Sequence, residues 1–328
     1  MVAFLILHYK ATAETIECIE SIRALTEPGT PPYIMVVDNA SNNGSYEVLA
    51  ERYRDASDVC VVTTGTGLGF SGGNHFGYRQ LLDRRDEIEF LVVCNNDIVF
   101  EQADLLQRLR QSYTKRPFDV LGPDIYKKVG SKVEKTSPMP RFMTKERYIR
   151  FMYHLHTYRV ANRSQTTTVT FGGALRAKLH GEKVSLRQAY RSYYPSFASF
   201  VRYNLQQYAA KLYHSAQRWY DPPRSPALLQ GACLIYSQAY LQTHETLFEP
   251  ETFFYYEEIL LYLRAQSEGL RLVYDPALKV WHKEQRATGT DRTGSEKYYF
   301  TQENYSKAEA IVLDTFAAMR NAHQELKP

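Results

Sequence analysis

The sequence predicts an α/β fold in which a mostly parallel central sheet is covered by helices on both faces, with a basic helical insertion and a helical C-terminal tail. Three observations lead to it. Strand and helix patterns alternate along the first hundred residues, several apolar strands end in polar side chains, and the α/β pattern stops near residue 126 and returns near residue 227.

The N-terminal pattern reads β-α-β-α-β-α-β, because short apolar runs alternate with segments whose apolar residues recur at helical spacing. The expected strands are residues 2–9, 33–41, 59–65 and 89–97. The expected helices are residues 12–26, 44–53 and 72–85, with a further helix at 103–113. Parallel neighbours need such crossover helices, so these strands are predicted to form a parallel sheet.

Regular α/β character returns in residues 227–241 and 270–282, and the last forty or so residues look helical. The predicted organisation is therefore a nucleotide-binding half at 1–125, a basic Tyr-rich insertion at 126–226, an acceptor-binding and catalytic half of the same domain at 227–290, and a helical tail at 291–328.

Composition is that of a folded protein: the chain has 328 residues, with 44% hydrophobic and 23% charged residues. No apolar run approaches the ~20 residues of a membrane span, and the first residues lack a basic leader and a small-residue cleavage site. We expect a cytoplasmic protein. The four cysteines have no CxxC spacing and are predicted to be reduced thiols.

The basic charge is concentrated in one segment. Residues 141–224 hold 15 Lys and Arg residues against three Asp and Glu residues. A concentrated basic patch favours an anionic partner, and we predict a peripheral contact with the inner face of the plasma membrane, with no nucleic acid partner. Within the segment, residues 200–220 form a basic amphipathic helix that includes Arg218 and Trp219. A packed surface helix or a dimer contact is the alternative.

A glycine loop, "GLGFSG" at residues 67–72, matches the G-x-G-x-x-G fingerprint of dinucleotide-binding folds. The order of the elements argues against that assignment. The fingerprint belongs in the first β-α turn, with an acid at the end of the following strand. Here the glycines follow the third strand, and the strand-end acid, Asp38, precedes them.

The fourth strand ends in two amides and a carboxylate, Asn95, Asn96 and Asp97. These residues could form a turn and cap the next helix. Alternatively they line a ligand site, since open α/β sheets bind ligands at the carboxyl ends of their strands.

Six motifs occur in one order: "VVDNAS", "GTGLGFSGGN", "NND", "GACLIY", "FFYYEEILLYLR" and "VWH". With them the chain resembles glycosyltransferase family 2, the inverting nucleotide-sugar enzymes of the Rossmann-like GT-A fold, and especially its rhamnosyltransferase-like branch. The resemblance covers about residues 1–125 and 228–285. It departs where the first strand ends in "HYK", where the metal triplet opens with Asn95 instead of Asp, and where the acidic pair is Glu-Glu instead of Glu-Asp.

The resemblance implies a set of site residues. Asp38 would accept a hydrogen bond from the base of a UDP- or dTDP-linked donor, and Asp97, Asn95 and His282 would hold Mn²⁺ or Mg²⁺. The expected nucleotide-sugar-binding residues are His8, Tyr9, Asp38, Asn39, Gly67, Gly72, Gly73, Asn74, Asn95, Asn96 and Asp97. Asp38 as an Asx turn and His282 as an ordinary hydrogen-bonded histidine are the structural alternatives.

Glu258 falls on the position of the family's catalytic Asp, so it is expected to be the general base, with Glu257 in support. An acidic pair at a helix N-terminus that serves only the helix dipole is the alternative. The implied activity is inverting, metal-dependent transfer of a hexose-type sugar, such as rhamnose, to a surface polysaccharide or lipid-linked glycan. A noncatalytic nucleotide-sugar or glycan-binding protein is the alternative function, and a glycosidase with Asp97 and Glu258 as paired carboxylates is disfavoured because it leaves the nucleotide-like half unexplained.

Overall fold

The computed structural model describes residues 1–25, 31–162, 178–179, 190–191, 193–217, 221–284 and 294–325. The chain divides into two compact units. Unit 1 comprises residues 1–141, 214–253 and 257–289, and unit 2 comprises residues 142–213, 254–256 and 290–328. The predicted insertion began at residue 126, whereas unit 2 begins at residue 142 and takes in the C-terminal helix.

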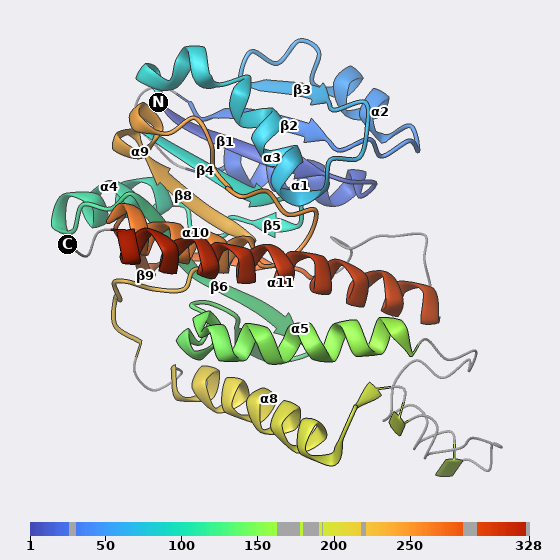
Figure 1. Cartoon of the computed structure of the whole chain (residues 1–328). Helices are drawn as coiled ribbons and strands as arrows, with labels where there is room; N and C mark the ends of the chain where they lie inside the picture. The colour runs from blue at the N-terminus through green and yellow to red at the C-terminus, as the bar shows by residue number, and fades with distance from the viewer. Residues whose placement is uncertain are drawn as a thin grey trace. The chain divides into compact units, whose positions relative to one another are not determined.

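The N-terminal half of unit 1 has the predicted alternation (Figure 1). Its parallel strands lie in the order β3-β2-β1-β4. The elements are β1 (Val2–His8), α1 (Thr12–Arg23), β2 (Tyr33–Asp38), α2 (Ser45–Arg52), β3 (Val59–Thr63), α3 (Gly69–Arg79), the 3₁₀ helix η1 (Leu82–Glu87) and β4 (Phe90–Asn95). Strand register places His8 opposite Asp38 and Leu7 opposite Asn95, so the predicted strand ends meet at one edge.

The second half of unit 1 extends the same sheet in the order β4-β8-β6-β9-β5, with β7 paired to β6. These elements are β5 (Ile98–Val99), α4 (Leu105–Lys115), β6 (Val120–Val129), β7 (Lys132–Lys135), β8 (Cys233–Ser237), α9 (Gln238–Thr243), α10 (Glu257–Glu268) and β9 (Leu272–His282). Strand β8 runs antiparallel to β4, and β5 antiparallel to β9. Strand β6 pairs with β9 in parallel and with β8 and β7 in antiparallel. The sheet is therefore mixed, with parallel pairs in both of its halves.

Helices cover both faces of this sheet because side chains alternate between the faces along each strand. Phe4 and Ile6 of β1 point into one core with α1, α2 and α4. On the other face, an added Cβ at Gly73 of α3 would lie 2.6 Å from Leu7, and one at Gly77 would lie 2.4 Å from Leu5. These two glycines let α3 pack closely against the sheet.

Unit 2 is helical in its described part. It contains η2 (Arg141–Thr144, with Arg141 assigned to unit 1), α5 (Glu146–Ala161), α8 (Phe197–Gln217, with its last four residues assigned to unit 1) and α11 (Gly294–Glu325). A buried polar cluster joins α5, α11 and Tyr256: His156 Nδ1 lies 2.8 Å from Glu309 Oε1, and the hydroxyl of Tyr256 donates to the same oxygen. The predicted C-terminal helix and the helix in residues 200–220 are both present, although Arg218 and Trp219 lie outside the described residues.

All four cysteines are free thiols, three of them buried and Cys60 half-buried. Across the described ranges, none of the helices combines the length and the apolar character that crossing a bilayer requires.

Candidate active site

Asp38, at the end of β2, has one carboxylate oxygen that accepts hydrogen bonds and one that accepts none from the described residues. The residue is 2% exposed, and its Oδ2 accepts hydrogen bonds from Ser41 N–H at 3.3 Å and from the Thr63 hydroxyl at 3.2 Å. Its Oδ1 is buried and has no hydrogen-bond partner among the described residues. Buried polar atoms are almost always satisfied, so an unpartnered oxygen at a strand end fits a hydrogen bond to a bound ligand.

His8, at the end of β1, has both ring nitrogens engaged. Nδ1 lies 2.6 Å from the Thr15 hydroxyl and Nε2 lies 2.8 Å from the Ser45 hydroxyl, and the residue is fully buried. Burial lowers the pKa of His8 to about 4, although the charges of Asp38 and Glu14 act in the opposite direction. The structure places His8 beneath the site, where it can support Asp38 from 3.7 Å.

The lowered pKa of His8 gives a pH prediction. The unfolded chain binds a proton on this histidine below its ordinary pKa of 6.5, whereas the folded chain does so only near 4. Stability is therefore full above pH 6.5 and is lost as the pH falls toward 4, by about 2 kcal/mol between pH 7 and 4.5. Denaturant unfolding at both pH values should show that His8→Gln removes this loss, while His154→Gln, at an exposed histidine, keeps it. An unchanged slope in His8→Gln would show that other groups cause the acid sensitivity.

Asn39 and the glycine loop hold each other. The Asn39 amide donates to the Gly69 carbonyl at 2.9 Å and accepts from Leu68 N–H at 2.9 Å. Gly69 has φ of +73°, and an added Cβ would lie 2.2 Å from the Phe253 carbonyl oxygen, so this position requires glycine. The sequence had instead predicted that Gly67, Gly72 and Gly73 bind the nucleotide-sugar.

Those three loop and helix glycines differ in surroundings. Gly67 has open space around it, Gly72 lies against Leu68, and Gly73 serves the packing of α3. Asn74 follows them and is 1% exposed, with its side-chain N–H donating to Phe70 and its Oδ1 buried without a partner among the described residues. Tyr9, after β1, is half-buried.

The triplet at the end of β4 divides into different environments. Asn95 is half-buried, and its backbone N–H donates to the Ala232 carbonyl at 3.0 Å. Asn96 is buried, and its side chain donates to Thr15 at 2.9 Å, so it fastens the triplet to α1. Through Thr15 this amide also connects to His8, which sequence reasoning could not foresee.

Asp97 and His282 are brought together by the pairing of β5 with β9, in which Ile98 lies opposite His282. His282 Nε2 lies 3.1 Å from Asp97 Oδ1. Asp97 Oδ2 and His282 Nδ1 are both buried and have no partner within the described ranges. A carboxylate oxygen and an imidazole nitrogen are suitable ligands for Mn²⁺, and one or two carboxylates with substrate phosphates are typical for Mg²⁺.

Few side chains at this site are available as metal ligands. Among the described residues no group of three or more His, Cys, Asp and Glu side chains could hold a metal ion. His282 Nε2 faces Asp97, so His282 Nδ1 points away from that carboxylate, and Asp97 Oδ2 and His282 Nδ1 each offer one ligand. A cation at either atom would take its remaining ligands from phosphate oxygens and water, and the two residues do not fit an all-protein metal cage.

The acidic pair begins α10. The Glu258 Oε1 accepts the Gly231 N–H at 3.1 Å, and the next residue, Ala232, accepts from Asn95. This short chain of contacts places Glu258 near the edge where the triplet lies. Burial raises the pKa of the Glu258 carboxyl, and backbone hydrogen bonds from Glu258 and Gly231 partly offset that rise. Glu257 is buried, with 5% exposure.

A family model described as Glycosyl transferase family 2 matches residues 4–180, which is more than half of the chain. The chain belongs to glycosyl transferase family 2. The matched range of the family 2 model contains Asp38, the glycine loop and the triplet, and it ends before Glu257, Glu258 and His282. The predicted family and the GT-A-like α/β fold are thereby confirmed, and the match does not support the finer rhamnosyltransferase branch.

Several solved structures of S. aureus TarS are similar to this family 2 chain. TarS 1–349 in complex with UDP-GlcNAc is 14% identical, with 99% of this chain and 73% of that chain covered and a TM-score of 0.49. The complex of the same fragment with UDP is 14% identical, with 100% and 73% covered and a TM-score of 0.47. No curated protein sequence matches the chain.

Proposed function

We propose that this family 2 member is a metal-assisted, inverting glycosyltransferase. It would move a sugar from a UDP- or dTDP-linked donor to a hydroxyl of a growing surface polysaccharide or lipid-linked glycan at the cytoplasmic face of the membrane. Rhamnose, which the rhamnosyltransferase-like motifs suggest, is the first sugar to test.

One observation carries the proposal. Four polar atoms on predicted site residues are buried and lack hydrogen-bond partners among the described residues: Asp38 Oδ1, Asn74 Oδ1, Asp97 Oδ2 and His282 Nδ1. Leaving each of them unpaired costs about 1–3 kcal/mol. A nucleotide-sugar with a cation would satisfy these atoms, because the imide N–H of uracil or thymine suits Asp38 and a divalent cation suits Asp97 and His282.

A bound divalent cation would neutralise the charge that gathers on the nucleoside diphosphate as it leaves. The side chains of the protein hold the donor and transfer a proton. Asp38 orients the base, Asp97 and His282 orient the diphosphate end, and the glycine loop lets backbone approach the donor. The Glu258 carboxylate takes the proton from the acceptor hydroxyl while the oxygen of that hydroxyl attacks the anomeric carbon. The bond from that carbon to the diphosphate breaks in the same displacement, so the configuration inverts.

The raised pKa of Glu258 suits a general base, because a more basic carboxylate accepts a proton more readily near neutral pH. Its bond from Gly231 N–H holds Oε1 of the carboxylate in place. Glu257 follows the strained pair Tyr255 and Tyr256, whose φ values are 74° and 69°. Such strain is typical of functional loops.

A thermal-shift screen tests donor binding. UDP-, dTDP- and GDP-linked sugars are compared, each with Mn²⁺, with Mg²⁺ and with EDTA. We expect UDP- or dTDP-sugars with a divalent cation to raise the apparent melting temperature most, since a ligand at 100 times its Kd adds about 2.7 kcal/mol of stability. A GDP-sugar that gives the largest shift would contradict the assigned role of Asp38.

The second candidate is a noncatalytic nucleotide-sugar or glycan-binding protein. Asn95 and Glu258 favour it, because both depart from the family pattern at positions expected to hold metal and base. Turnover decides between the two: release of UDP or dTDP that depends on acceptor supports the enzyme, whereas ligand-induced stabilisation with no product supports the binding protein.

A further inference from the structure

Helix α8 is apolar on two opposite faces. Its inner face packs within unit 2, where Phe200 and Tyr203 join the cluster around Leu155, Tyr193 and Tyr194. A surface helix normally buries one such face and presents polar side chains on the other. In α8 the outer face is apolar as well.

The outer face forms a stripe at helical spacing, here called the α8 stripe. At about 100° per residue its members lie within an arc of about 80°. Their exposed fractions range from 37% to 71%, and they are Phe197, Val201, Leu205, Tyr208 and Leu212. Large exposed apolar patches mark interaction surfaces rather than ordinary solvent-facing helix.

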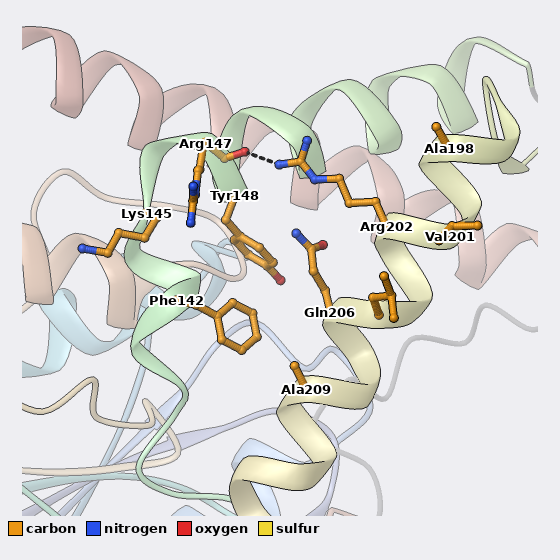
Figure 2. A pocket seen from close by; sticks show the side chains of 10 residues that line it. Phe142, Lys145, Arg147, Tyr148, Ala198, Val201, Arg202, Gln206 and Ala209 are labelled. Atoms are coloured by element: carbon orange, nitrogen blue, oxygen red, sulfur yellow. Dashed lines mark hydrogen bonds between the residues drawn. The ribbon is translucent and has the colours of Figure 1, made fainter.

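A groove of about 590 Å³ continues this surface between α8 and the start of α5. Figure 2 shows aromatic Phe142 and Tyr148 on one wall and Gln206 and Ala209 of α8 on the other. Val201 and Leu205 belong to both the groove and the stripe.

Cations border the groove, and they are Lys145, Arg147 and Arg202. The guanidinium of Arg202 donates to the Arg147 carbonyl at 3.0 Å and lies over Phe151. Within the described ranges no carboxylate pairs with any of these three side chains.

Acidic side chains are almost absent from this region. Residues 142–213 contain 12 Lys and Arg residues but two acidic residues, Glu146 and Glu182. Glu146 is engaged by Arg150 and Arg320, and Glu182 lies outside the described residues. The charge of the surface is therefore complementary to an anionic partner.

We propose that the α8 stripe and the cationic groove beside it dock on the surface of an anionic lipid bilayer. The apolar side chains enter the boundary between head groups and acyl chains, while Lys145, Arg147 and Arg202 face lipid phosphates. A second copy of the chain is a poorer occupant, because a two-fold interface sets each patch against itself and brings these cations together.

Vesicle cosedimentation tests the proposal with the full chain and no donor, so its result does not depend on the proposed transferase activity. Phosphatidylcholine vesicles are compared with vesicles that also contain phosphatidylglycerol, at low and raised salt. We expect binding to the anionic vesicles, weakened by salt because the Debye length shortens. A double change, Leu205→Glu with Leu212→Glu, should weaken it at least about tenfold, since each residue loses apolar insertion and gains repulsion.

The matched control is Val48→Glu with Val133→Glu, which places the same charges at two other exposed apolar positions. A second pair, Lys145→Gln with Arg147→Gln, should reduce binding to anionic vesicles, and Arg52→Gln with Lys115→Gln should not. Melting temperatures verify that each variant folds.

Three outcomes would overturn the proposal. The protein could fail to sediment with either vesicle, or the stripe variant could bind as well as the Val48 and Val133 control. The third is self-association that depends on concentration, is abolished by the stripe variant and occurs without vesicle binding, which would identify the surface as an interface between copies.

Discussion

Glu258→Gln should lower the transfer rate by roughly 10²–10⁴ while donor affinity stays close to that of the wild type. Glutamine keeps the size of the side chain and an oxygen that can accept the Gly231 N–H, which Glu258 accepts at 3.1 Å. It cannot take a proton from the acceptor at neutral pH. The loss should therefore appear in the chemical step, measured as initial rate at saturating donor and acceptor.

The pH profile adds a readout that a structural role would not change. Burial raises the pKa of Glu258 above its ordinary value of 4.5, so the base is lost by protonation at a higher pH than for an exposed glutamate. The wild-type rate should fall on the acid side of that raised pKa, and Glu258→Gln should lack this limb.

Glu257→Gln is the comparison variant, because it makes the same change one position earlier on α10. Adjacent helical residues point in different directions, so this variant should lose less activity. An inactive Glu257 variant beside an active Glu258 variant would refute the assignment. A product that retains the donor's anomeric configuration would refute single displacement.

Asp97→Asn should lower turnover by on the order of 10² or more and remove the contribution of Mn²⁺ to donor binding. The asparagine keeps the shape of the side chain and an oxygen for His282 Nε2, which lies 3.1 Å from Asp97 Oδ1 in the wild type. It loses the negative charge that attracts a cation. Donor affinity is measured by calorimetry with and without Mn²⁺.

Asp83→Asn, at an exposed aspartate of η1, is the control for the change from Asp to Asn. His282→Asn should reduce the Mn²⁺ contribution as well, because its unpaired Nδ1 is the second candidate ligand. Full activity of Asp97→Asn at saturating donor would mean that the triplet is only a turn. A lost rate with an unchanged Mn²⁺ contribution would assign Asp97 a role apart from metal binding.

Much of the sheet could be predicted because its signals are local. Strands β1 to β4 lie within the predicted ranges, since their apolar runs and the helical spacing between them are properties of short windows. The meeting of Asp38 and Asn95 at one edge also followed, because parallel strands align their carboxyl ends. The two-residue strand β5 and the 3₁₀ helix η1 were not predicted, as segments so short leave little periodicity.

Other features of the site had no local signal. The hydroxyls of Thr15, Ser45 and Thr63 that hold His8 and Asp38 are common residue types at unremarkable positions. Asn39 was expected to face the nucleotide, and its amide is used by the glycine loop. That pairing could not be predicted from the "VVDNAS" motif, because it depends on how the fold brings the backbone of residues 68 and 69 next to Asn39.

The sequence by itself determined the fold class, the family and the residue types at the strand ends, because periodicity and motif order are written along the chain. The tertiary structure decided which of those residues meet. His282 reaches Asp97 across 185 positions through the β5–β9 pairing, and Glu258 reaches Gly231 across 27. The physical reason is that such contacts join residues far apart in the sequence. They depend on how the strands of the whole sheet pair, and no short stretch encodes that pairing.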